Sequence, residues 1–191
     1  PPPPPPPPHF QPTRRNPRLV SDWSSDVCSS DLRVTTDASR LSKGYVEKLL
    51  AGALPPERYV EALGVVVQVL SIDRADEALG LPLEPLPAPV AGEPTRKGPK
   101  SVVPGAGFVL WIDTADLGPD DADLFGPLPQ VPNVLRALSL VPAEVRGWMD
   151  LSAALYLAPD EMMSFESKGA LTRAQIELVA GRLSALNECF Y

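Results

Sequence analysis

The sequence predicts an all-α fold, and three observations lead to this prediction. Apolar residues recur at helical spacing in the segments 33–81 and 108–191. Residues that commonly start and stop helices bound the apolar runs of both segments. Between them, 82–107 is rich in proline, and because each proline fixes φ and lacks an N–H group, this segment is expected to be an extended linker.

Composition excludes several classes of protein. The 191 residues include 17 Lys and Arg against 24 Asp and Glu, and the net charge of −7 disfavours a nucleic-acid partner. No apolar run reaches the roughly 18 residues that cross a bilayer. Two cysteines, Cys28 and Cys189, are too few for a disulfide-rich scaffold or a four-thiolate zinc site. We therefore expect a reduced, cytoplasmic protein with no metal and no cofactor.

The first 32 residues are expected to be a non-native, disordered leader. Residues 1–8 are all proline, and the single histidine, His9, follows them. Ser25 to Leu32 reads SDVCSSDL, which resembles the translation of a sequencing adapter. Such segments are set aside before the fold is considered, and Cys28 is set aside with them.

Two helices are predicted in 33–81. Ser39 or Ser42 can cap a first helix that runs to about Leu50 and stops at Gly52. A second helix is expected to open at Pro55-Pro56-Glu57, where a missing N–H group has no cost. It should run to about Leu79 and stop at Gly80, and its middle is apolar on nearly all sides, which predicts a central, fully buried helix.

The second half begins with an extended segment, 108–112, which is too short and isolated to make a sheet. Helical patterning resumes near Val134, and Pro142 is expected to start a helix over 143–157. The residues expected on its inner side are Val145, Trp148, Met149, Leu151 and Leu155. A last helix should begin with a capping box formed by Thr172 and Gln175. Its apolar stripe comprises Ile176, Val179, Ala180, Leu183 and Leu186.

Glu177 and Cys189 are the candidate catalytic residues. On one unbroken helix, twelve residues apart, they would be separated by about 18 Å. Asn187 is a poor residue in a helix interior and a good N-cap, so the helix could stop there and Cys189 could enter the first turn of another. A helix N-terminus favours the nucleophilic thiolate. The residues alone leave two other interpretations open, a buried core cysteine and a solvated glutamate.

The segments 170–180 (ALTRAQIELVA) and 184–191 (SALNECFY) resemble the active-site region of AhpD-like alkylhydroperoxidases, in the carboxymuconolactone decarboxylase superfamily. That family carries a Glu and, twelve positions later, Cys-x-x-Cys followed by a His. Glu177 and Cys189 match the Glu and the first cysteine. The second cysteine and the His have no counterpart, so we expect a truncated and inactive fragment.

The resemblance extends to 54–82, which is similar to the closing helix of another such domain, and to the proline-rich linker of two-repeat members of the family. It implies an incomplete AhpD-like helical domain, with 33–81 as the end of a first repeat and 108–191 as the start of a second. The two halves could pack together. Family members commonly associate, so the resemblance also implies a homo-oligomer.

The resemblance further implies reduction of a hydroperoxide substrate by a dithiol, which an external thiol reductant then resets. Cys189 would be the resolving cysteine and Glu177 part of a proton relay that also uses the His. One alternative is a decarboxylase-type acid/base enzyme that does not need Cys189. Another is a non-catalytic helical oligomerisation module with Trp111, Trp148 and Phe125 as interface anchors.

Three further motifs favour structural roles. Asp120-Asp121-Ala122-Asp123 predicts a solvated acidic loop rather than a cation site. Gly105-Ala106-Gly107 lacks the strand and helix of a dinucleotide-binding loop and predicts a turn. Met162-Met163, next to Phe165, is expected to fill core or an interface.

Overall fold

The computed structural model describes residues 33–52, 54–88, 91, 97–126, 128, 130–158, 161, 164 and 170–186. Most of the secondary structure is helical, as the sequence predicts. The helices are η2 (Ala38–Arg40), α2 (Lys43–Leu50), α3 (Pro56–Leu79), η3 (Pro119–Asp121), α4 (Asn133–Arg136), α5 (Pro142–Leu155) and α7 (Arg173–Leu186). The strands are β1 (Val102–Val103) and β2 (Trp111–Ile112). Among these residues, no helix is both long enough and apolar enough to span a bilayer.

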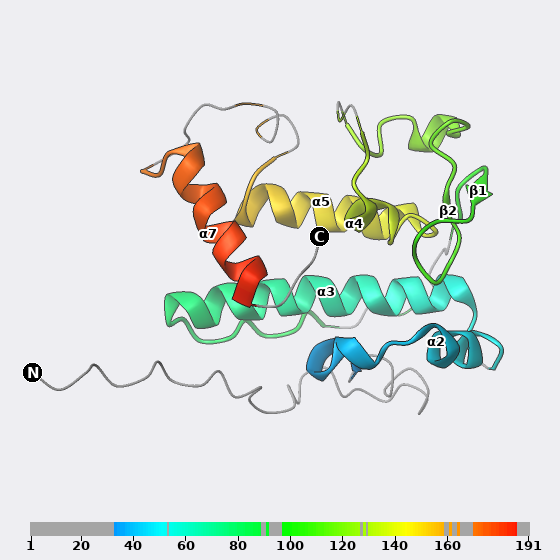
Figure 1. Cartoon of the computed structure of the whole chain (residues 1–191), viewed down its shortest axis with the longest axis horizontal. Coiled ribbons are helices and arrows are strands. Elements are labelled where there is room, and N and C mark those ends of the chain that lie inside the picture. The colour runs from blue at the N-terminus through cyan, green and yellow to red at the C-terminus, as the bar shows by residue number, and fades with distance from the viewer. Residues whose placement is uncertain are drawn as a thin grey trace, which may run out of the picture.

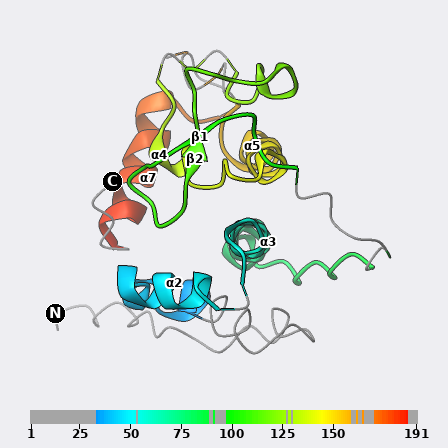
Figure 2. The ribbon, with the colours of Figure 1, turned by 90° about the vertical axis from the view of Figure 1, so that its right-hand side faces the viewer.

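The long helix α3 lies between α2 and α5 (Figures 1 and 2). The predicted boundaries of α2 and α3 are confirmed. Ser42 caps α2 by accepting a hydrogen bond from the Tyr45 N–H group at 3.3 Å. Gly80 ends α3 in the left-handed conformation with φ of 69°, which glycine adopts without steric cost.

One hydrophobic core joins the two halves of the chain. It includes buried residues from before the proline-rich segment and from after it. The cluster comprises Val46, Leu54, Tyr59, Val60, Ala62, Ile112, Leu124, Phe125, Leu135, Leu138, Leu140, Val141 and Val145. The two halves therefore pack together in this chain, and the division into two repeats stays a prediction.

The prediction of a fully buried α3 is wrong. Its buried apolar residues are Tyr59, Val60, Ala62 and Val66, all in the first half of the helix, whereas Val65 is exposed. The last turns lie outside the core, and Leu79 is 73% exposed. The all-round apolar pattern misled because, among the described elements, α3 packs mainly against α5, and one neighbouring helix covers only one side of it.

The prediction that 108–112 makes no sheet is also wrong. Trp111 and Ile112 pair with Val103 and Val102 in an antiparallel ladder, so β1 lies inside the segment expected to be an unpaired linker. The pair is stabilised by its attachment to the core. The buried Ser139 side chain accepts a hydrogen bond from the Ile112 N–H group at 2.9 Å.

The proline-rich segment is extended over 81–88, as predicted, with no helix or strand and every residue exposed. The glycines of Gly105-Ala106-Gly107 lie in the loop between β1 and β2, which confirms a turn, and they lie against the indole ring of Trp111. Arg136 stacks on the ring, with its guanidinium carbon 4.8 Å from the ring centroid. Trp111 and Phe125 are 3% and 5% exposed. They are core residues, and the prediction that they anchor an interface is wrong.

Candidate functional site

Glu177 lies in the second turn of α7, where a capping box fixes the start of the helix. The Thr172 N–H group donates to Gln175 Oε1 at 2.8 Å, and the Gln175 N–H group donates to Thr172 Oγ1 at 3.3 Å. This confirms the predicted box. Because the cap sets where helical hydrogen bonding begins, it places Glu177 one turn after Arg173, on the same face of α7.

Two donors hold the Glu177 carboxylate. The Arg173 Nε–H group donates to Glu177 Oε1 at 2.7 Å, and the Tyr156 hydroxyl donates to the same oxygen at 3.1 Å. Tyr156 is the C-cap residue that directly follows α5. The carboxylate therefore connects the residue that follows α5 to the first turns of α7, which lies beyond the C-terminal end of α5 in Figure 1.

Arg173 is itself anchored. Its Nη1 group donates to the backbone carbonyl oxygens of Glu161 and Ser164 at 3.1 and 3.3 Å. The Arg173 side chain is only 18% exposed, whereas that of Glu177 is 48% exposed. A guanidinium is planar, so hydrogen bonds on two of its nitrogens fix its orientation. Arg173 is thus a fixed donor, and Glu177 is an accessible acceptor.

Burial raises the pKa of the Tyr156 phenol above its usual value. The hydrogen bond that it donates to Glu177 and the negative charge of that carboxylate raise this pKa further, against a smaller opposing effect of Arg173. Tyr156 consequently remains a neutral hydrogen-bond donor around neutral pH. The arrangement thus places a cation and a phenol each within hydrogen-bond distance of the same carboxylate oxygen.

Cys189 lies outside the described residues, as do Asn187 and the rest of the chain after Leu186, where α7 ends. The predicted approach of Cys189 to Glu177 therefore stays a prediction. Met162, Met163 and Phe165 are also outside the described residues.

Tyr156 and Arg173 were not among the predicted site residues. The Arg173 contact was readable from the sequence, because opposite charges four residues apart meet on one helix face. No local signal relates Tyr156 to Glu177, since they are 21 residues apart and Tyr156 lies outside α7, directly after α5.

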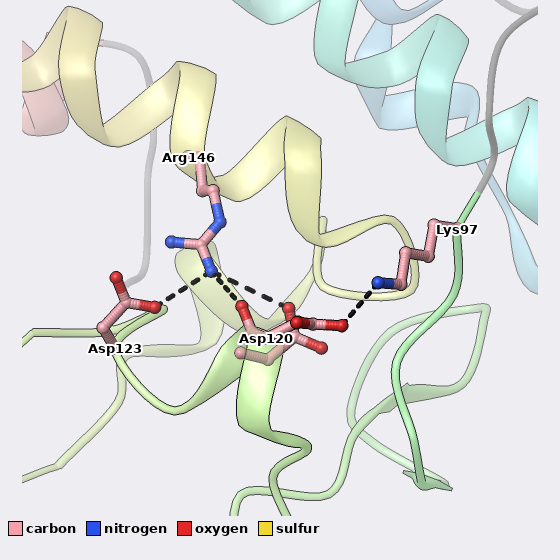
Figure 3. Close-up of polar contacts among 5 residues, drawn as sticks. Lys97, Asp120, Asp123 and Arg146 are labelled. Atoms are coloured by element: carbon pink, nitrogen blue, oxygen red, sulfur yellow. Dashed lines mark hydrogen bonds and ion pairs between the residues drawn. The ribbon is translucent and has the colours of Figure 1, made fainter.

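The acidic loop at 120–123 is an ion-paired cluster (Figure 3). Lys97 pairs with Asp120 at 2.5 Å, and Arg146 of α5 donates to Asp123 Oδ1 at 3.0 Å. Lys97 lowers the pKa of Asp120, and Arg146 that of Asp123, in each case mainly through the hydrogen bond. The loop is exposed, as predicted. Its carboxylates are not merely solvated, however, because Lys97 and Arg146 form ion pairs with them. Over the described part of the chain, no group of acidic, His or Cys side chains could hold a metal ion.

A second carboxylate lies between α3 and α5. Gln68 Nε2 donates to Glu144 Oε2 at 3.4 Å. Burial raises the pKa of Glu144 to about 7, and the negative charge of Glu61 adds to the effect. The sequence pattern gave no indication that Glu144 is buried or that its pKa is raised. Glu144 lies in the first turn of α5, where acidic residues are commonly exposed and interact favourably with the helix dipole.

A pocket of about 330 Å³ opens between the start of α3 and the loop that joins β1 to β2. Its described lining residues are mostly apolar and include Leu50, Phe108, Leu110 and Leu140, and among them Glu57 alone is charged. Glu177 and its two donors do not line this pocket, so it is separate from the candidate site.

Comparison of the chain with protein families, with curated proteins and with solved structures found no match.

Proposed function

We propose that the chain carries part of a thiol-dependent peroxidase site, in which Glu177 belongs to the proton relay and Cys189 is the resolving thiol. The substrate is a hydroperoxide, and an external thiol is the reductant. The observation that supports this is the carboxylate of Glu177, which two donors hold in place while it remains half exposed. A solvated surface glutamate would not need a neutral donor from another helix.

The chemistry requires a second cysteine. Its thiolate attacks the terminal peroxide oxygen and breaks the O–O bond, which yields a sulfenic acid and, after proton transfer, an alcohol. The Cys189 thiol then attacks the sulfenic sulfur, releasing water and forming a disulfide, which the external thiol reduces. Glu177 would accept and return the protons of these steps.

The distance along the chain between Glu177 and Cys189 sets a condition on this proposal. From Glu177 to Leu186, α7 advances by about 14 Å. The chain must therefore reverse after Leu186 for Cys189 to reach the carboxylate. A stop at Asn187, followed by a new helix that begins near Cys189, would provide the reversal.

Alkylation of Cys189 tests the proposal. The Cys28→Ser variant leaves Cys189 as the single thiol. We expect iodoacetamide to modify it in the folded chain at neutral pH, because a redox thiol must be accessible and partly ionised. Modification that occurs only after denaturation would identify a core cysteine and overturn the proposal. The reading frame gives an independent test, since a residue other than Cys three positions after Cys189 would remove the dithiol.

The acid/base alternative is favoured by one observation, which is that Tyr156 and Glu177 form a hydrogen-bonded donor–acceptor pair without any thiol. If that alternative holds, Cys189→Ser should leave turnover of a lactone or related acid unchanged, whereas Tyr156→Phe should lower it. The peroxidase proposal predicts instead that the chain does not turn over such a substrate at all.

A further inference from the structure

The pocket between the start of α3 and the loop that joins β1 to β2 has no role in the proposed function. Its volume of about 330 Å³ lies at the lower end of the range of sites that hold small molecules. Its lining includes Leu50, the last residue of α2, and Leu140, which precedes α5. Both residues belong to the core or pack against it. One side of the pocket is therefore a packed surface, and the loop forms another.

The loop presents apolar side chains to this pocket. Val109 lines the pocket and also packs against the core. Phe108 and Leu110, on either side of it, line the pocket too, and each is 45% exposed. Large apolar side chains that stay exposed around a hollow are typical of a site that a ligand with an apolar surface covers.

Glu57 gives the pocket its charge. It is half-buried in the first turn of α3, and it is the charged member of the described lining. Over the described part of the chain, no basic side chain pairs with its carboxylate and no donor bonds to it. A carboxylate that is partly removed from water without a partner costs free energy, which a cation beside it would offset.

We infer that this pocket binds a small amine, whose apolar part lies against Leu50, Phe108 and Leu140 and whose ammonium group pairs with Glu57. A carboxylate ligand would be repelled by Glu57, and a neutral ligand would leave it unpaired. The Phe108 ring adds a surface to which a cation is attracted. This inference does not depend on the proposed function, because Glu177 does not line the pocket.

A role for Glu57 in helix stability alone makes a different prediction. Acidic side chains in the first turn interact favourably with the helix dipole. If Glu57 does nothing else, Glu57→Gln lowers the free energy of unfolding, and the pocket does not discriminate between ligands by charge.

The experiment titrates three probes of similar shape into the isotope-labelled full chain near neutral pH. Phenethylamine is a cation, phenethyl alcohol is neutral and phenylpropionate is an anion. The amide resonances of 107–110 report binding, together with the indole N–H resonance of Trp111, whose ring lies against Gly105 and Gly107 of the pocket lining. We expect the amine to bind about fivefold more tightly than the alcohol, and the anion to bind most weakly.

Two substitutions test the two parts of the site. Glu57→Gln should raise the Kd of the amine about fivefold, to that of the alcohol, whose own Kd stays the same. Phe108→Ser should weaken the binding of amine and alcohol alike. Glu47→Gln and Leu81→Ser are the matched controls, because each changes an exposed residue outside the pocket lining, and neither should alter any Kd. Leu110→Ser replaces Phe108→Ser if that variant does not fold.

Four outcomes would overturn the inference. Equal affinity of the parent chain for amine and alcohol would exclude a preference for a cation. A preference for the amine that survives Glu57→Gln would remove Glu57 from the site. Absence of any shift in 107–110 at millimolar probe would mean that the pocket binds none of these compounds. Shifts of the same resonances with protein concentration alone would show that a second copy of the chain occupies the pocket.

Discussion

The Glu144 side chain on α5 fills the space in which a β-carbon at Gly64 of α3 would lie. A β-carbon built at Gly64 would be 2.9 Å from Glu144 Cγ and would overlap the carboxylate. A similar relationship joins Gly147 of α5 to Gln68 of α3, whose Oε1 atom would be 3.0 Å from a β-carbon at Gly147. Each helix thus places a polar side chain against a glycine of the other helix. These two side chains, Glu144 and Gln68, are hydrogen-bonded to each other.

The burial of Glu144 predicts a stability that falls as pH rises. Its folded pKa of about 7 lies above the ordinary value of 4.5. The folded state therefore binds the proton more tightly than the unfolded state. The resulting stabilisation is complete below about pH 4.5 and is lost as pH rises through 7.

Glu144→Gln should remove this pH dependence and stabilise the chain at pH 8. Because Glu144 is partly exposed, solvent screening reduces the gain to about 1 kcal/mol. Urea unfolding at pH 5 and pH 8 measures it. Glu47→Gln, on the exposed face of α2, is the control and should behave like the parent chain. Equal stability of parent and Glu144→Gln at both pH values would contradict the burial of this charge.

Gly105→Ala should destabilise the packing around β2. Its β-carbon would overlap the six-membered ring of Trp111, which is 3% exposed and has no room to move away. Overpacking of this kind costs about 1–3 kcal/mol. Thermal unfolding monitored by tryptophan fluorescence measures the loss.

Gly44→Ala is the matched control for that substitution. Nothing lies within 4 Å of a β-carbon at Gly44, in the first turn of α2. Alanine is the better helix former, so a gain of up to about 1 kcal/mol is expected. A loss of stability in both variants would mean that the clash with Trp111 is not the cause.

Arg146→Gln should loosen the loop that carries the acidic cluster. Arg146 Nη2 donates to the Asp120 carbonyl oxygen at 2.7 Å and to Asp123 Oδ1 at 3.0 Å. Glutamine is shorter and uncharged, so both contacts are lost. We expect faster amide hydrogen exchange in 119–124, with the exchange of α3 unchanged. Added salt should narrow the difference between the two proteins, because these groups are exposed to solvent.

The sequence predicted the helix boundaries well because they depend on local chemistry. Ser42, Gly80 and the box formed by Thr172 and Gln175 act within a few residues of chain, and all are confirmed. Features that depend on distant residues were missed. Val102 pairs with Ile112 because the core and Ser139 hold β2 in place. Each strand has only two residues, which is too short for a recognisable alternation of apolar and polar residues in the sequence.

The candidate site divides in the same way. Arg173 and Glu177 follow an i,i+4 rule, whereas the Tyr156 contact depends on how α5 and α7 pack. The raised pKa of Glu144 likewise depends on the burial that the packing of α5 on α3 creates, and on the negative charge of Glu61, which belongs to α3.

The exposed apolar side of α7 predicts self-association. Val179, Leu183 and Leu186 recur at helical spacing and are 56%, 54% and 61% exposed. A homo-oligomer would cover them. Leu183→Glu places a charge in such an interface and should shift sedimentation equilibrium towards the monomer at micromolar concentration. Ala185→Glu adds the same charge to the same helix outside the stripe and should leave the association constant unchanged. A parent chain that sediments as a monomer, or equal association in both variants, would contradict an interface on this side of α7.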